Sequence, residues 1–501
     1  MPDAVLAIDQ GTTGSTALVL DADGRVLGRA TEEFTQHYPQ PGWVEHDPEE
    51  IWRVSLEVIG AALGEAELAD GDLRAIGITN QRETTVVWDR TTGEPIHRAV
   101  VWQSRQTADI CQKIRENGLE PMITERTGLV VDPYFSGSKV KWILDQYPES
   151  RQRAEGGELV FGTIDTWLLY KLTGGEVHAT EPTNASRTLL YDIRSLAWDA
   201  ELLEIFGVPE AMLPEVKPSS GVFGTTVPAG ALPGGVPVAG IAGDQQAALY
   251  GQGCWQPGMV KNTYGTGCFV MLNTGSELQR SNCGLLTTVC CDAHGRAAYA
   301  LEGSVFTTGA AVQWLRDEMG LIGSAVETEE VASRIHDTQG VYVVPAFAGL
   351  GAPYWDMDAR GAIVGLTRGS GRDQIIRATL DSIAYQTRDV VDAMNCDGST
   401  SVHELRADGG AAANNLLMQF QADILGVPVV RPRLLETTAA GSAFLAGLGV
   451  GMWRDPGELE GAWREDRRFE AEMDPGQRDL LYQGWRAAVE RVRADRREPT
   501  V

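Results

Sequence analysis

The chain has 501 residues, enough for two or more domains with full cores, and its 43% hydrophobic content is that of a globular protein. Its 69 acidic residues outnumber its 42 basic ones and give a net charge of -27, which disfavours nucleic acid or an anionic membrane as a partner. The seven cysteines are scattered without CxxC or zinc-like spacing, no apolar segment reaches eighteen residues, and the N-terminus lacks a leader-like apolar stretch, so we expect a cytoplasmic protein without a membrane-inserted segment.

The first predicted element is a β-hairpin closed by a polar turn. Residues 4–8 and 17–20 are apolar runs typical of buried strands, and residues 9–16 between them read Asp-Gln-Gly-Thr-Thr-Gly-Ser-Thr. The glycines allow a backbone to approach an anion closely, and the hydroxyls and amides can donate to it. Asp9 has no cation beside it in the sequence and is placed for a metal. On its own, the pattern also fits an ordinary polar turn.

Strand-like and helix-like segments then alternate, which predicts α/β architecture. Residues 74–88 are interpreted as a second hairpin whose turn carries Arg82 and Glu83, either as a functional pair or as a surface salt bridge. A short strand is expected at 100–103, and a helix opens within 132–139.

A long irregular connection is expected just before the middle of the chain. Glycine and proline peak between residues 218 and 240, ahead of a strand at 237–243 and a helix that starts at Asp244. An aspartate there is commonly a helix N-cap. It also lies at the carboxyl end of a strand, where α/β folds place ligand-binding groups.

The second half repeats the pattern of the first. Strands at 259–263 and 268–272 flank the turn Tyr264-Gly-Thr-Gly267, so we expect a duplicated domain with a nucleotide between the copies. A third glycine site, 408–410, opens a helix with Asn414 and Asn415 in its first turn, placed to meet a base or ribose. The apolar positions of that helix are Leu416, Leu417, Phe420 and Ile424. A closing amphipathic helix is expected to pack through Leu480, Leu481, Trp485, Val489 and Val492.

Eight segments, in this order and spacing, resemble the FGGY carbohydrate kinase family of the actin-like ATPase superfamily, and within it the members that act on glycerol. They lie at residues 9–13, 42–48, 77–85, 132–137, 240–246, 262–269, 349–356 and 375–387. The resemblance implies an α/β fold of two duplicated actin-like (ribonuclease H-like) domains flanking a nucleotide and substrate cleft. Residues 1–247 would form the polyol-binding domain with the first phosphate loop. Residues 248–501 would form the domain that binds the adenine nucleotide and carries the C-terminal helix.

The resemblance also assigns roles, with Asp244 as general base and Asp9 associated with Mg²⁺, partly through water. The implied glycerol-binding residues are Arg82, Glu83, Trp102, Tyr134, Asp244, Gln245 and Phe269. The implied nucleotide-binding residues are Thr12, Thr13, Gly14, Thr16, Thr266, Gly309, Gln313, Gly410 and Asn414. These side-chain types suit the task, because a triol needs several directional hydrogen-bond partners and an apolar wall.

The implied reaction is ATP-dependent phosphorylation of glycerol to sn-glycerol 3-phosphate in glycerol catabolism, with ATP and Mg²⁺ bound. Phosphoryl transfer needs positioning, charge neutralisation and a base for the hydroxyl, and domain closure would limit wasteful hydrolysis by excluding water. The expected partners are a small-molecule substrate and further copies of the chain in a dimer or tetramer.

Two features depart from the family pattern. Thr16 stands where many members carry an arginine near the nucleotide phosphates. The connection at 226–237 contains no Arg, Lys or His, whereas relatives inhibited by fructose 1,6-bisphosphate have an arginine there and relatives activated by phosphotransferase-system phosphorylation have a histidine. Neither form of regulation is expected.

Three alternatives stay open at this point. An FGGY kinase for another polyol or sugar, such as xylulose, is disfavoured by Arg82 and Glu83. An actin- or chaperone-like ATPase would not need the polar set around residues 82, 134 and 244. A catalytically inactive nucleotide sensor should have lost Asp9 or Asp244, and both are present. The absence of a Gly-Lys dipeptide excludes a Walker A loop.

Overall fold

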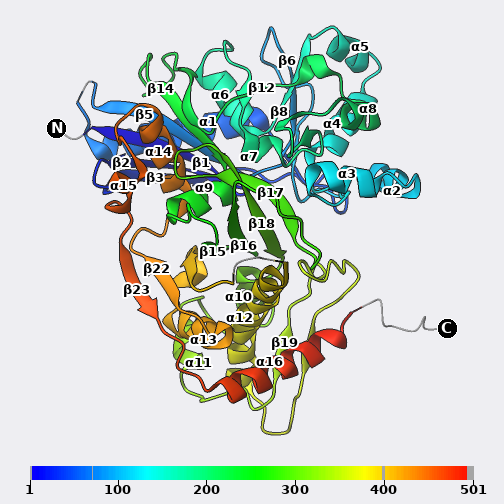
Figure 1. Cartoon of the computed structure of the whole chain (residues 1–501), viewed down its shortest axis with the longest axis vertical. Helices are drawn as coiled ribbons and strands as arrows, with labels where there is room; N and C mark the ends of the chain where they lie inside the picture. The colour runs from blue at the N-terminus through cyan, green and yellow to red at the C-terminus, as the bar shows by residue number, and fades with distance from the viewer. Residues whose placement is uncertain (1–2, 70, 398–400, 494–501) are drawn as a thin grey trace.

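The computed structural model describes residues 3–69, 71–397 and 401–493. The chain forms two halves, each built on a central sheet, with the N-terminal half at the top of Figure 1 and the C-terminal half below it. Strands β17 and β18 run between the halves.

The first sheet has six strands in the order β13-β14-β5-β1-β2-β3. Strands β1, β2 and β3 are antiparallel, whereas β5 and β14 run parallel to β1, so the predicted first hairpin is confirmed. The strands span Ala4–Gln10 (β1), Gly14–Asp21 (β2), Val26–Glu33 (β3), Leu73–Asn80 (β5), Ser220–Thr225 (β13) and Pro237–Gly243 (β14).

The second sheet repeats this plan with one extra edge strand, in the order β17-β18-β16-β15-β21-β22-β23. Strand β15 is antiparallel to β16 and parallel to β21, as β1 is to β2 and β5. The predicted duplication is therefore confirmed. The strands span Val260–Tyr264 (β15), Cys268–Gly275 (β16), Leu286–Cys291 (β17), Ala297–Val305 (β18), Leu405–Asp408 (β21), Val429–Pro432 (β22) and Glu465–Phe469 (β23).

Two equivalent helices tie the halves together. Helix α9 (Asp244–Gly251) follows β14, and α14 (Thr437–Gly449) follows β22. They pack against each other, and α14 packs on β5, β14 and β1 of the first sheet although it belongs to the second half of the chain. Gly251 and Gly441 allow this close approach, because a Cβ on either would collide with the backbone of the other helix. The two sheets are thus held together by crossed helices.

The remaining elements of the first half form an outer lobe and a covering helix. Helix α1 (Pro48–Ala66) packs on β2 and β3 and begins at Asp47, whose carboxylate accepts hydrogen bonds from the amides of Glu49 and Glu50. The other helices are α2 (Ala108–Glu116), α3 (Glu120–Thr127), α4 (Ser136–Gln146), α5 (Ser150–Glu155), α6 (Ile164–Leu172), α7 (Pro182–Ala185), α8 (Ala200–Phe206) and the 3-10 helix η1 (Glu210–Met212). Short strand pairs join β4 (Glu45–His46) to β7 (Ala99–Val100), β6 (Val86–Asp89) to β8 (Leu159–Gly162), β9 (Ala179–Thr180) to β12 (Glu215–Val216), and β10 (Tyr191–Asp192) to β11 (Ala197–Trp198).

The second half has its largest core around α12 (Arg372–Asp397), a helix that is buried for most of its length. The other elements are α10 (Gly309–Asp317), α11 (Glu327–Ala332), η2 (Gly410–Ala413), α13 (Asn415–Leu425), α15 (Pro456–Glu460), α16 (Pro475–Glu490) and the paired strands β19 (Tyr342–Val344) and β20 (Ala362–Val364). Among the described residues, no helix is both long enough and apolar enough to cross a membrane.

Four sequence predictions about local structure were wrong. Residues 74–88 are not a hairpin, because β5 pairs with β1 and β14 while β6 pairs with β8. The strand expected at 100–103 ends at Val100, and the connection at 218–240 contains the edge strand β13. Leu480 is 68% exposed and lies off the packed face of α16.

The cysteines also differ from the pattern expected for scattered thiols. Cys283 and Cys396, 113 residues apart in the sequence, form a disulfide, whereas the other five cysteines are free and buried. The spacing of the cysteines gave no sign of this pair.

Candidate active site

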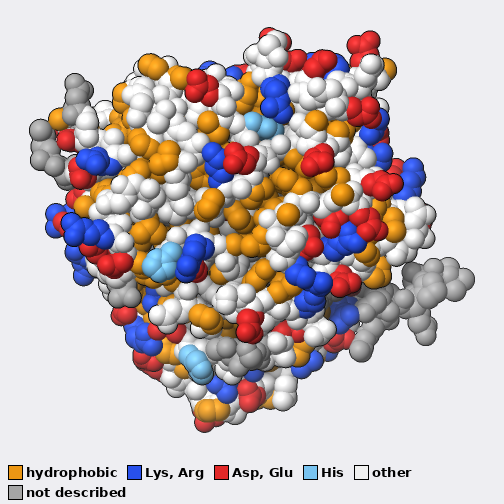
Figure 2. Space-filling model, turned by 45° about the horizontal axis from the view of Figure 1, so that its top comes forward, with side chains coloured by type: hydrophobic (Ala, Val, Ile, Leu, Met, Phe, Trp, Pro, Cys, Tyr) orange, Lys and Arg blue, Asp and Glu red, His pale blue; other side chains and the backbone are white. Residues whose placement is uncertain are grey.

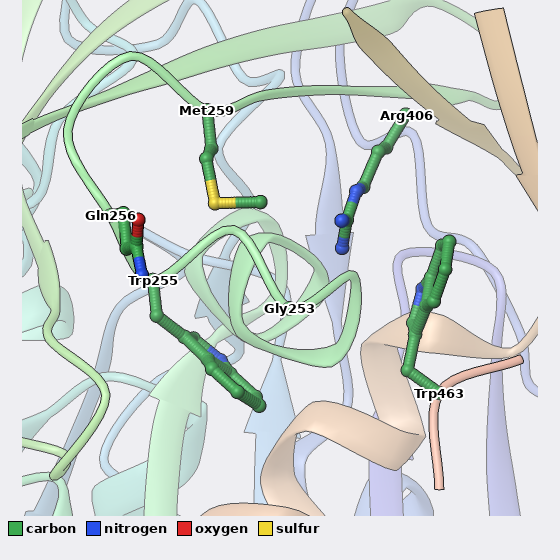
Figure 3. Close-up of a pocket in the computed structure, with 6 residues that line it drawn as sticks. All are labelled: Gly253, Trp255, Gln256, Met259, Arg406 and Trp463. Atoms are coloured by element: carbon green, nitrogen blue, oxygen red, sulfur yellow. The ribbon is translucent and has the colours of Figure 1, made fainter. Parts of the chain in front are cut away.

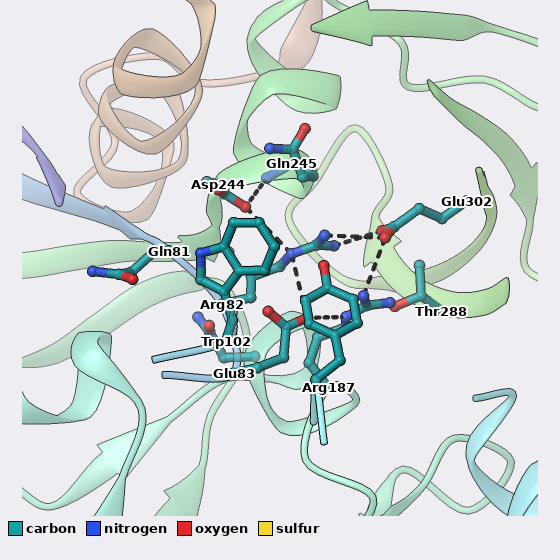
Figure 4. A network of polar contacts seen from close by, with 12 residues as sticks. Gln81, Arg82, Glu83, Trp102, Arg187, Asp244, Gln245, Thr288 and Glu302 are labelled. Atoms are coloured by element: carbon teal, nitrogen blue, oxygen red, sulfur yellow. Dashed lines mark hydrogen bonds and ion pairs between the residues drawn. The ribbon is translucent and has the colours of Figure 1, made fainter. Parts of the chain in front are cut away.

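The predicted polyol-binding residues meet where the two halves join (Figure 4). Arg82 and Glu83 follow the carboxyl end of β5, and Asp244 and Gln245 begin α9 after β14, the parallel neighbour of β5. Phe269 comes from β16 of the second half, with its ring 5.7 Å from the Arg82 guanidinium. Carboxyl ends of adjacent parallel strands thus place the charged groups together.

Arg82 is the centre of a buried ion-pair network. Its Nη1 and Nη2 donate to the two oxygens of Glu302, at 2.6 and 3.0 Å. Its Nε lies 3.3 Å from Asp244 Oδ1 and 3.8 Å from Glu83 Oε1. Arg187 completes the network, with Nε donating to Glu83 Oε1 at 2.6 Å and Nη2 to Glu302 Oε1 at 3.1 Å.

Glu302, Arg187 and Lys261 were not predicted from the sequence. Burial raises the pKa of Glu302, but Arg187 and Arg82 outweigh it and lower the pKa to about 2. Lys261 is buried and donates to Gln245 Oε1 at 2.6 Å and to Thr263 Oγ1 at 2.9 Å. Burial lowers the pKa of Lys261 to about 8, although the negative charges of Asp408 and Asp244 act to raise it.

Burial raises the pKa values of both predicted catalytic carboxylates above the ordinary value for aspartate. Burial raises the pKa of Asp244, and Arg82 and Lys261 oppose that shift. Burial, together with the charge of Asp244, raises the pKa of Asp9 to about 7. Asp244 is the first residue of α9 and accepts from the Gln245 amide at 2.7 Å, so it also stabilises the start of that helix, with 27% of its side chain exposed.

The aromatic rings predicted to form the wall of the polyol site lie together and contact the first turn. The rings of Trp102 and Tyr134 lie 5.5 Å apart edge to face, and Arg187 lies 5.5 Å from the ring of Tyr134. Trp102 Nε1 donates to Thr12 Oγ1 at 2.9 Å. The predicted substrate wall and the predicted phosphate turn are therefore in direct contact.

Hydrogen bonds from neighbouring polar side chains hold the turn at 9–16 in place. Gln36 Nε2 donates to Thr12 O at 3.0 Å, and its Oε1 lies 2.7 Å from His46 Nε2. Gln81 Nε2 donates to Gly11 O and Gln10 Oε1, both at 3.1 Å. Burial lowers the pKa of His46 to about 3, so the imidazole is neutral here. The turn is held from two sides.

A cavity of about 440 Å³ lies beside the second turn. It is bounded by the turn of β15 and β16, by α10, by the region of α11, and by η2 and the start of α13. Gly409 has φ +85°, and a Cβ there would collide with the Tyr264 backbone, so only glycine brings η2 against this turn.

Five of the predicted nucleotide residues line this cavity, and four do not. Those that line it are Thr266, Gly309, Gln313, Gly410 and Asn414. The cavity is not lined by the other four, Thr12, Thr13, Gly14 and Thr16. Thr12 and Thr13 lie in the turn between β1 and β2, and Gly14 is the first residue of β2. Thr16 Oγ1 instead lies 2.9 Å from Thr31 Oγ1 of the neighbouring strand β3. The sequence gave no signal for Arg316, Val326, Thr328 and Glu329, which also line the cavity.

The residues near Asp9 fit a partly hydrated divalent cation. Asp9 and Asp244 repel each other, which raises the pKa of Asp9, and a cation would relieve that repulsion. Within the described ranges no cluster of three or more His, Cys, Asp or Glu forms a metal cage. Mg²⁺ is commonly held by one or two carboxylates together with substrate phosphates and water, and this donor set suits that mode.

A second cavity, of about 310 Å³, lies away from these residues (Figure 3). It is lined by Gly253, Trp255, Gln256, Met259, Arg406 and Trp463. Arg406 stacks on the ring of Trp463 at 4.2 Å and donates to the carbonyl of Gln252 at the end of α9, which is a structural use of its charge. On the face that Figure 2 shows, acidic and basic side chains are interspersed.

Two sheets of one plan, each with a Gly/Thr hairpin turn and joined by crossed helices, define an actin-like phosphotransferase fold. The chain belongs to the FGGY family of carbohydrate kinases: the model of the family's N-terminal domain matches residues 4–251 and that of its C-terminal domain matches residues 260–450. The boundary predicted between residues 247 and 248 stays a prediction.

Sequence relatives and solved structures support this family assignment. The glycerol kinase of Carboxydothermus hydrogenoformans is 58% identical over 98% of both chains, and that of Listeria monocytogenes is 58% identical over 98% of this chain and 99% of its own. Among solved structures, Plasmodium falciparum glycerol kinase with ADP has a TM-score of 0.91 at 36% identity, covering 98% of each chain. Xylulose kinase from Rhodospirillum rubrum, with a TM-score of 0.83, 23% identity and coverage of 97% and 98%, shares the fold.

Proposed function

We propose that this chain transfers the γ-phosphoryl group of ATP to glycerol, forming sn-glycerol 3-phosphate and ADP. The observation that carries the proposal is the pair of buried residues Arg82 and Glu83 beside the partly exposed Asp244 at the junction of the halves. The chain is also 58% identical to a glycerol kinase over nearly its full length. A small triol matches this site because each hydroxyl finds a charged hydrogen-bond partner.

In this proposal Asp244 is the general base for the attacking hydroxyl. The hydroxyl donates to the Asp244 carboxylate and loses its proton to it as the bond to phosphorus forms. Burial raises the pKa of Asp244, which strengthens it as a proton acceptor, while Arg82 and Lys261 oppose that shift and favour the carboxylate form. Arg82, Glu83 and Gln245 orient the other hydroxyls, and Trp102, Tyr134 and Phe269 bound the carbon chain.

The adenine nucleotide occupies the cavity beside the second turn in this proposal. Gly410 and Asn414 lie at the start of η2 and α13, and Thr266 and Gly309 lie at the turn and at the start of α10. Backbone amides at such positions can donate to phosphates. The turn at 9–16, with Thr12, Thr13 and Gly14, faces the phosphates from the first half. Asp9 would hold Mg²⁺, partly through water, which neutralises phosphate charge when bound.

The decisive experiment measures ADP release with a panel of polyols and sugars. Glycerol should give the highest kcat/KM, and D-xylulose, D-gluconate, ribitol and erythritol should give little ADP above the rate without acceptor. A different preferred acceptor would make the chain an FGGY kinase of another specificity. Assembly into dimers or tetramers stays a prediction, which light scattering of the purified protein tests.

A further inference from the structure

Glu302 belongs to the second half of the chain but points into the polyol site of the first half (Figure 4). It lies in the middle of β18, paired with Met271 of β16 on one side and Leu286 of β17 on the other. A residue on a strand paired along both edges has little freedom to move. Its side chain is fully buried.

The contacts of Glu302 are those of a clamp on two arginines of the first half. Both of its oxygens accept from Arg82, and Oε1 also accepts from Arg187. A two-point carboxylate–guanidinium pair fixes the plane of the guanidinium as well as its position. With Nη1 and Nη2 engaged by Glu302, the Nε edge of Arg82 is left turned toward Asp244 and Glu83.

We propose that Glu302 is a positioning residue for polyol phosphorylation, which acts by holding Arg82 beside Asp244. Glu302 does not itself contact the polyol. The pocket therefore forms only when β18 of the second half is seated against the first half. The inference rests on the proposed function for the identity of the polyol.

Burial alone does not explain this arrangement. A buried ion pair is often no more stabilising than well-packed apolar groups of the same size, whereas removing one partner leaves an uncompensated buried charge. Here two arginines lie within one network with the carboxylates of Glu302, Glu83 and Asp244. Without Glu302, the Arg82 guanidinium would pair more closely with the carboxylates of Asp244 and Glu83. Those carboxylates would then be less able to accept hydrogen bonds from substrate hydroxyls.

The first test is Glu302→Gln, which keeps the size of the side chain and removes its charge. The KM for glycerol should rise by about tenfold to a hundredfold, as expected when a charged hydrogen-bond partner is lost, while the affinity for ATP measured without glycerol should change less than about threefold. Glu302→Asp, which restores the carboxylate, should recover part of the glycerol affinity. The matched control is Glu404→Gln. Glu404 is the residue before β21, and its carboxylate pairs with Arg468. This variant should leave both constants unchanged.

The second test asks whether Glu302 acts through Arg82. Residues that act as one unit show non-additive effects, so the double variant Arg82→Ala/Glu302→Gln should have a kcat/KM for glycerol within about threefold of Arg82→Ala alone. If the two losses multiply, or if ATP affinity falls together with glycerol affinity, the positioning role is wrong and Glu302 is a general structural residue. Failure of the wild-type chain to phosphorylate glycerol would instead refute the proposed function, and the same tests then apply with the acceptor found in the panel.

Discussion

Two opposing effects act on the pKa of Asp244. Burial favours the neutral acid, and Arg82, with its Nε 3.3 Å away, and Lys261 favour the carboxylate. A base is most effective when its pKa lies near the working pH, and this balance provides a means to reach it. The structural alternative is that Asp244 only accepts from the Gln245 amide at the start of α9.

Asp244→Asn separates these two roles. The amide oxygen can still accept from the Gln245 amide, but it cannot take a proton, and loss of a general base typically lowers rates about 10² to 10⁴-fold. We expect kcat to fall by that range while glycerol binding, measured by calorimetry, weakens much less. Near-normal turnover would leave Asp244 as a helix-start residue.

Arg82→Ala addresses the choice of substrate. Truncation leaves Glu302 and Glu83 with fewer partners in a buried site, and unpaired buried groups cost roughly 1 to 3 kcal/mol. The apparent affinity for glycerol should fall by about one to two decades, and ATP affinity measured without glycerol should hardly change. A variant that keeps glycerol affinity and loses ATP binding would contradict the assignment.

At the scale of residues, the site residues that were predicted lie in recognisable local motifs, whereas those that were missed have partners far away in the sequence. Arg82, Glu83 and Asp244 lie directly after buried strands, where carboxyl ends mark binding groups. Glu302 is 220 residues from Arg82 and Arg187 is 104 residues from Glu83. An isolated Glu in a strand or an Arg in a loop carries no local sign of such a partner, so only the folded chain reveals the network.

At the scale of elements, alternating apolar segments predicted strands well and their pairing less well. The hairpins of β1 with β2 and of β15 with β16 were predicted, with strands at 4–8 and 17–20 and at 259–263 and 268–272, because a short glycine-rich turn favours pairing of the strands that flank it. The same reasoning failed at 74–88. Both edges of β5 are taken by β1 and β14, so β6 pairs with β8 in the outer lobe. A central parallel strand cannot be told from a hairpin arm by composition alone.

Helix α16 offers a test of how one element is attached. Tyr482 and Trp485 of α16 donate to the two oxygens of Asp389 on α12, at 2.6 and 2.8 Å. Burial raises the pKa of Asp389 to about 7, against these hydrogen bonds. Because the folded state holds this proton more tightly than the unfolded chain, the stability due to protonation is complete below the unfolded pKa and is lost as pH rises through about 7.

Asp389→Asn removes this titration. The free energy of unfolding of the wild type, relative to that of the variant, should fall by up to about 1.4 kcal/mol per pH unit as pH rises from 5 towards 7. It should level off above the folded pKa of about 7, and denaturant titrations at each pH measure it. Buried Glu181 and Asp381, whose pKa values burial also raises, are present in both proteins and cancel in the difference. The control is Asp479→Asn, which replaces an exposed aspartate of α16 and should leave the pH dependence unchanged. A pH-independent difference for Asp389→Asn would show that Asp389 is ionised throughout.

At the scale of the whole molecule, the site depends on both halves at once. The proposed base, Asp244, begins α9, which packs against α14 from the other half. Phe269, Lys261 and Glu302 reach the first half from the second sheet. The duplication was predictable from two similar turns. The crossing of α9 and α14 was not, because a helix that follows a strand gives no sign of which sheet it covers.

The connection at 226–237 carries the last prediction, which concerns regulation. A bisphosphate needs fixed cations or free backbone amides to hold it, and this connection contains no Arg, Lys or His in a chain of net charge -27. Its amides are largely used within the protein. Those of Ala229 and Leu232 donate to each other's carbonyl, and those of Thr226, Val227, Gly235 and Val236 donate to other acceptors.

Pro228, Pro233 and Pro237 have no amide N–H. Within the connection, this leaves the amides of Gly230, Ala231 and Gly234 without such a bond among the described residues. We therefore expect millimolar fructose 1,6-bisphosphate to leave glycerol-dependent ADP release unchanged at constant free Mg²⁺. Three amides without a cation cannot compensate the desolvation of a multiply charged ligand. Replacing Ala231, an exposed residue of the connection, with Arg serves as the comparison, because it adds the missing charge at an unpaired amide. Dose-dependent inhibition of the wild type that disappears when residues 229–235 are replaced would show that the backbone binds the bisphosphate by itself.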